Sequence, residues 1–78
     1  MKIQILGPGC YNCRLLAEKV EEAAQELGLD YELEKVTDLA EIARLGVFMT
    51  PGLVIDDEIK LTGRVPPMGP IKELLARS

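Results

Sequence analysis

The feature that most constrains this chain is a pair of cysteines, three residues apart, placed where a strand pattern gives way to a helix pattern. Residues 1–6 read as a short strand rich in branched apolar residues. After the pair, apolar residues recur at helical spacing as far as Leu27, with charged residues on the other face. The spacing therefore predicts that Cys10 begins a helix and that Cys13 lies in its first turn.

This placement has chemical consequences for the two thiols. Side chains at positions i and i+3 of a helix have β-carbons about 5–6 Å apart, so modest adjustment lets a disulfide form. The first N–H groups of a helix lack intrahelical partners, and they lower the pKa of a thiol at the helix start. Cys13 falls on the apolar side with Leu16 and Val20. An exposed Cys10 and a sheltered Cys13 predict a redox-active pair.

Length and charge limit the size of the core and the class of partner. A chain of 78 residues predicts one domain, residues 1–78, with a small core. A net charge of −4 without a basic cluster argues against nucleic acid or an anionic membrane as partner. No segment resembles a membrane span or a signal peptide, and two cysteines at this spacing are not a secreted disulfide framework. We expect a cytoplasmic protein, and we expect a monomer.

The rest of the chain alternates between strand and helix patterns. Residues 29–36 alternate apolar and charged positions, which is typical of a half-exposed edge strand. The further predicted elements are a short helix between Asp38 and Gly46, a hairpin with strands at 52–55 and 58–62, and a helix from about Pro70. The predicted order is β-α-β-α-β-β-α, with the first two strands parallel because a helix connects them.

This arrangement resembles the thioredoxin-fold superfamily over essentially all of residues 1–77. The resemblance rests on a strand, a Cys-x-x-Cys that opens a helix, and Thr50–Pro51 directly before a strand, hairpin and helix. Within the superfamily, the chain is similar to small thioredoxin-like or glutaredoxin-like redox-active disulfide proteins. The resemblance implies an α/β fold with a four-stranded mixed sheet flanked by helices on both faces.

The resemblance also implies roles for single residues. Cys10 becomes the nucleophile, Cys13 the resolving cysteine, and Pro51 a cis-proline that faces the disulfide. Thr50 would offer its backbone to an extended substrate, and we interpret Tyr11 as an aromatic flank against that substrate. The resemblance implies no cofactor besides the cysteine pair and no metal. Its implied partners are disulfide-containing proteins and, as electron donor, a thioredoxin-reductase-like flavoprotein.

The site departs from both of the families it resembles. Thioredoxins have Trp-Cys-Gly-Pro-Cys and a buried acid in the preceding strand, whereas this chain has no tryptophan and carries Gln4 in that strand. We interpret Gln4 as a polar residue tolerated near one sheet face rather than as a group beneath the cysteines. Glutaredoxins hold glutathione with a glycine pair and acids, and the corresponding residues 62–65 contain one glycine and no acid.

Two other functions fit parts of the pattern. Copper chaperones also place Cys-x-x-Cys between a strand and a helix, and soft thiolates suit Cu(I). Those proteins have Met-x-Cys-x-x-Cys, with Pro8 at the methionine position here, and the order β-α-β-β-α-β. Two thiolates without any histidine would leave a zinc site half empty. A non-catalytic binding module with the thioredoxin fold is the third possibility, and the intact cysteine pair argues against it. We therefore predict a thiol–disulfide oxidoreductase that reduces or exchanges disulfides of proteins or small molecules through a mixed disulfide.

Overall fold

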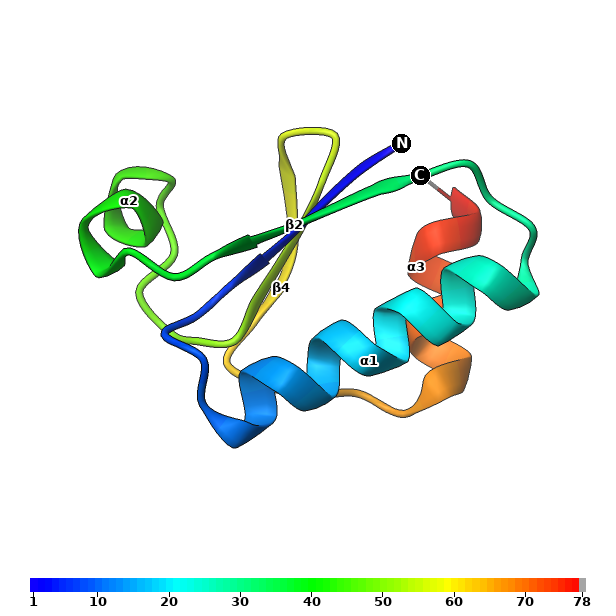
Figure 1. The fold of residues 1–78 in the computed structure, drawn as a ribbon, viewed down its shortest axis with the longest axis horizontal. Helices are drawn as coiled ribbons and strands as arrows, with labels where there is room; N and C mark the ends of the chain where they lie inside the picture. Colours follow the sequence, from blue (N-terminus) through cyan, green and yellow to red (C-terminus); the bar gives the residue numbers. More distant parts are fainter. Residues whose placement is uncertain (78) are drawn as a thin grey trace.

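Strand β1 lies inside a four-stranded sheet whose strand order is β2-β1-β3-β4. The computed structural model describes residues 1–77, so Ser78 of the predicted domain falls outside the described part. The elements are β1 (Lys2–Leu6), α1 (Tyr11–Glu26), β2 (Glu32–Val36), α2 (Leu39–Arg44), β3 (Gly52–Ile55), β4 (Glu58–Thr62) and α3 (Met68–Arg77) (Figure 1). This order confirms the predicted β-α-β-α-β-β-α arrangement. It ends on a helix, unlike the order expected of a copper chaperone.

The sheet is mixed. β1 pairs with β2 in parallel, as the helical connection through α1 requires, and it pairs with β3 in the antiparallel direction. β4 continues the sheet beyond β3 as the second strand of a hairpin. Because β1 has a neighbour on both sides and helices on both faces, all of its residues after Lys2 are buried. The predicted edge position of β2 is also confirmed.

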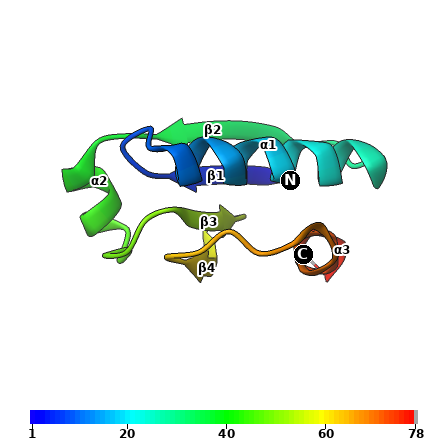
Figure 2. The same cartoon turned by 90° about the horizontal axis from the view of Figure 1, so that it is seen from below.

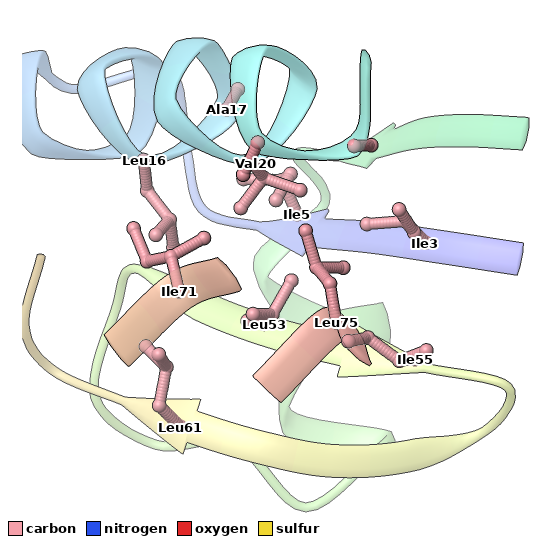
Figure 3. Packing of buried hydrophobic residues seen from close by; sticks show 12 residues of the cluster. Ile3, Ile5, Leu16, Ala17, Val20, Leu53, Ile55, Leu61, Ile71 and Leu75 are labelled. Atoms are coloured by element: carbon pink, nitrogen blue, oxygen red, sulfur yellow. The ribbon is translucent and has the colours of Figure 1, made fainter. Parts of the chain in front are cut away.

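The two faces of the sheet carry separate apolar cores, because successive side chains of a strand point to opposite faces. α1 and α3 pack against each other on one face, and α2 lies on the other (Figures 1 and 2). Ile3 and Ile5 point into the larger core, where Leu16 of α1 meets Ile71 of α3 (Figure 3). The smaller core under α2 consists of Leu6, Ile42, Val47 and Val54. No helix within residues 1–77 combines the length and the apolar character needed to cross a membrane.

Two element boundaries differ from the sequence-based prediction. β2 begins at Glu32 rather than at residue 29 because its ladder partner β1 begins at Lys2, and the register pairs these two residues. α3 begins at Met68, before Pro70. Proline is tolerated there because the first N–H groups of a helix have no intrahelical partner in any case.

Gln4 has the structural role that the sequence suggested. Its side chain is 8% exposed, and its Nε2 donates to Glu34 Oε1 at 3.0 Å. Glu34 is also the residue opposite Gln4 in the β1–β2 register. The amide is thus satisfied across the strands on the α2 face, away from the face that α1 covers.

We predict that shortening Ile71, which is fully buried, to valine lowers the free energy of unfolding by about 0.5–1.5 kcal/mol, because a methylene is lost from the larger core. Ile59→Val is the matched control, since Ile59 is 44% exposed on β4. Urea denaturation of both variants measures the difference. An equal effect of the two substitutions would contradict the assignment of Ile71 to the core.

Candidate active site

The cysteine motif lies where the chain leaves β1 and enters α1, at the same end of the sheet as α2 (Figures 1 and 2). The Gly7 N–H donates to Val36 O at 2.9 Å, which fastens the loop to the end of β2. Gly9 has φ +91°, a left-handed conformation that glycine adopts without steric cost. This turn directs the chain into α1, whose N-cap residue is Cys10.

The two thiols occupy different environments at the helix start. Cys10 is exposed, whereas Cys13 is 4% exposed. The Cys13 N–H donates to Cys10 Sγ at 3.3 Å, so this sulfur caps one of the unpaired N–H groups of the helix. The two Sγ atoms are 2.6 Å apart, and both cysteines are free thiols. The geometry confirms the predicted pair of one accessible and one sheltered sulfur.

The same contacts separate the acidities of the two thiols. The hydrogen bond from the Cys13 thiol, followed by that from the Cys13 backbone N–H, lowers the pKa of Cys10 because both stabilise a thiolate. Burial raises the pKa of Cys13, and the hydrogen bond it gives to Cys10 raises it further. A thiolate is thus favoured at the exposed sulfur over the buried one.

Gly7 allows the buried sulfur to sit against the backbone. A β-carbon at Gly7 would lie 2.2 Å from Cys13 Sγ, far inside van der Waals contact, and 3.7 Å from Thr50 Cβ. Gly7 therefore adjoins both Cys13 and Thr50, the residue before Pro51. Sequence reasoning did not assign this role to Gly7, although its place directly after the strand was a usable signal.

The Thr50–Pro51 segment is brought to the motif by strand pairing. Leu6 pairs with Gly52 in the β1–β3 register, so the residues just outside this pair, Gly7 and Pro51, are neighbours. The Thr50–Pro51 bond is cis, as the resemblance implied, and Pro51 is buried. The Pro51 carbonyl accepts from the Gly63 N–H at 2.8 Å. Direct packing of the proline ring on the sulfurs stays a prediction.

Exposed apolar side chains flank both parts of the site. Tyr11, predicted as an exposed aromatic residue, is 69% exposed. Phe48 and Met49, which directly precede Thr50, are 83% and 65% exposed. The sequence analysis did not single out these two residues. The available signal was their position before Thr-Pro, outside any helical or strand periodicity.

A small cavity of about 30 Å³ lies beside Cys13. Its lining includes Arg14 of α1 and both Lys35 and Thr37 from the end of β2. The lining is almost wholly apolar, so Arg14 and Lys35, both exposed, border the cavity with the apolar parts of their side chains. Within residues 1–77, no group of three or more His, Cys, Asp or Glu side chains is placed to hold a metal ion.

Comparison with known proteins decides the family. The sequence model described as "Thioredoxin domain" matches residues 1–76. The chain belongs to the thioredoxin domain family. It is 45% identical over 76 residues, 97% of this chain and 99% of the relative, to a thioredoxin from Methanothermobacter thermautotrophicus. It is 48% identical over 73 residues, 94% of this chain and 84% of the relative, to a thioredoxin from Methanocaldococcus jannaschii.

Structural similarity agrees with the sequence matches. The fold resembles that of thioredoxin 1 from Thermosipho africanus with a TM-score of 0.66 at 22% identity, over 99% of this chain and 92% of that one. Together with the thioredoxin relatives and the presence of both cysteines, the family assignment makes this chain a thiol–disulfide oxidoreductase. The predicted family, fold class and enzyme class are thereby confirmed.

We predict that Gly7→Ala slows formation of the Cys10–Cys13 disulfide and lowers the free energy of unfolding by about 1–3 kcal/mol, because the new methyl group overlaps Cys13 Sγ. Gly69→Ala is the control, since a β-carbon there meets no atom within 4 Å. Disulfide formation in a glutathione redox buffer and urea denaturation measure the two effects. Wild-type behaviour of Gly7→Ala in both assays would contradict the close contact.

Proposed function

We propose that this protein reduces or exchanges disulfides of protein substrates through a mixed disulfide with Cys10, which Cys13 then resolves. The observation that carries the proposal is the exposed Cys10 sulfur, hydrogen-bonded at the start of α1 and 2.6 Å from a buried second sulfur. An accessible thiolate is suited to attack a substrate disulfide. A buried neighbouring thiol is suited to displace the substrate from the resulting mixed disulfide. The proposed acting unit is the single domain of residues 1–78, as a monomer in the cytoplasm.

The reaction balances within the cysteine pair and the substrate. The Cys10 thiolate forms a bond to one substrate sulfur, the substrate S–S bond breaks, and the other substrate sulfur leaves as a thiolate. Cys13, as thiolate, then attacks Cys10 Sγ, and the second substrate sulfur leaves. Two electrons pass from the cysteines to the substrate. A thioredoxin-reductase-like flavoprotein is the electron donor that we propose for the return step. The cysteine pair itself holds the electrons, so the proposal needs no bound cofactor.

The second step requires that Cys13 lose its proton despite burial, which raises its pKa. Thioredoxins place an acid in the strand before the motif, and this chain has Gln4 there, bonded to Glu34. We propose that the backbone hydrogen bonds of Cys10 and Gly9, which lower the pKa of Cys13, favour its thiolate in this step.

The substrate is proposed to lie across the segment before β3. The backbone of Thr50 would pair with an extended substrate strand, which gives affinity without dependence on sequence. Tyr11, Phe48 and Met49 would contact apolar substrate residues, because all three expose large side chains beside the motif or the Thr50–Pro51 segment. The ring of Pro51 would cover the two sulfurs and shield them.

We predict that Cys13→Ser accumulates a stable mixed disulfide with a protein substrate, because the attacking Cys10 remains and the resolving thiol is gone. Cys10→Ser, the matched variant, should accumulate little or none, since Cys13 is 4% exposed. Non-reducing electrophoresis and intact-mass measurement detect the adduct. Equal trapping by both variants would refute the division of roles. No insulin reduction by the wild-type protein with dithiothreitol would refute the proposed function.

A further inference from the structure

A groove between β4 and α3 lies outside the cysteine site. It encloses about 520 Å³, which is in the range of about 300–1,000 Å³ typical of small-ligand sites. Figure 2 shows the orange loop, residues 63–67, that joins the two elements. Residues 64–67 of this loop line the groove. The Pro66 carbonyl accepts from Lys19 Nζ of α1 at 3.4 Å, which fastens this loop to the body of the protein.

The walls of the groove are apolar and stiff. Val65 and Leu74 are half-buried and face the groove from the loop and from α3. The remaining apolar lining consists of Pro66, Pro67 and Pro70. Proline fixes the backbone angle φ, so a ligand that enters does not have to order this loop. A preformed site of this kind binds at a lower cost in conformational entropy.

The rim of the groove is positive on a protein that is negative overall. Lys60, Arg64 and Arg77 line it against the single carboxylate of Glu73, whereas the whole chain carries a net charge of −4. Glu73 is paired with Arg77, and Lys60 is paired with Glu58 at 3.2 Å. Arg64 has no ion pair within residues 1–77 and is exposed. Charge complementarity therefore favours an anionic occupant, and Arg64 is the cation available to it.

The Arg64 end of the groove adjoins the proposed substrate path. Gly63, the residue before Arg64, donates its N–H to the Pro51 carbonyl at 2.8 Å. A substrate strand that follows Thr50 and Pro51 therefore needs little additional length to reach Arg64. A guanidinium group can hold a carboxylate with two parallel hydrogen bonds, which a neutral amide cannot replace.

We propose that this groove binds an acidic, partly apolar segment of the protein substrate, outside the disulfide that Cys10 attacks. This role rests on the proposed function, and it makes the protein selective for disulfide substrates that carry such an acidic segment. A carboxylate of the segment pairs with Arg64 at the entrance, and an apolar side chain packs on Val65 and Leu74. The negative net charge of the chain as a whole favours this positive groove as the place where such a segment binds.

The test uses two disulfide-containing peptides of equal length, whose segment beyond the cysteine contains Asp and Glu in one and Asn and Gln in the other. We expect kcat/KM of the wild-type protein to be about three- to ten-fold higher for the acidic peptide, the range of one or two exposed ion pairs. Arg64→Gln should remove this preference and leave kcat/KM for the amide peptide unchanged. Added salt should weaken the preference as well.

The matched control is Arg44→Gln, an exposed cation of α2 that pairs with Glu41 and does not line the groove. It should keep the preference for the acidic peptide. Equal kcat/KM of the wild-type protein for both peptides, or an equal loss of preference in both variants, would overturn the proposed role of the groove. Either result would leave the proposed function intact. If the wild-type protein reduces neither peptide, the proposed function fails, and the role of the groove fails with it.

A second readout does not depend on turnover. A cysteine-free acidic peptide should shift the NMR signals of Val65 and Leu74 in the wild-type protein and not those of α2. Arg64→Gln should require a higher peptide concentration for the same shifts. Shifts confined to other surfaces would overturn the proposal.

Discussion

The contact between the Gly7 backbone and the Cys13 sulfur is the constraint on which the site depends. A side chain at Gly7 would occupy the position of that sulfur, so the absence of one lets Cys13 turn inward against the end of β1. Cys10 then stays outside as the helix cap, and the two sulfurs meet at 2.6 Å. Gly7 also lies close to Thr50, so the segment that leads into β3 lies near the buried thiol. The accessibility and the acidity of the two thiols both follow from this packing.

The chain separates its charges in a way that fits a redox protein with selective partners. A net charge of −4 coexists with a positive groove beside β4. Gln4 stands where thioredoxins offer an acid, so this chain has no carboxylate at that position to accept the Cys13 proton.

The sequence predicted the features that local rules control, and it missed those that depend on tertiary contact. Strand β1, the start of α1 and the hairpin came from periodicity and turn residues, and the position of Cys10 and Cys13 followed from them. The boundary of β2 was wrong because it is set by where β1 begins. The steric role of Gly7, the cavity at Lys35 and the groove at Arg64 each join residues distant in sequence. No local pattern carries such information.

The most direct test of this account is a titration of the two thiols in the reduced protein, followed by NMR of the cysteine β-carbons. The account predicts a pKa for Cys10 below that of a free cysteine, about 8.5, and a pKa for Cys13 above it, because helix-start hydrogen bonds stabilise one thiolate and burial disfavours the other. Two equal values, or a Cys13 that ionises before Cys10, would contradict it.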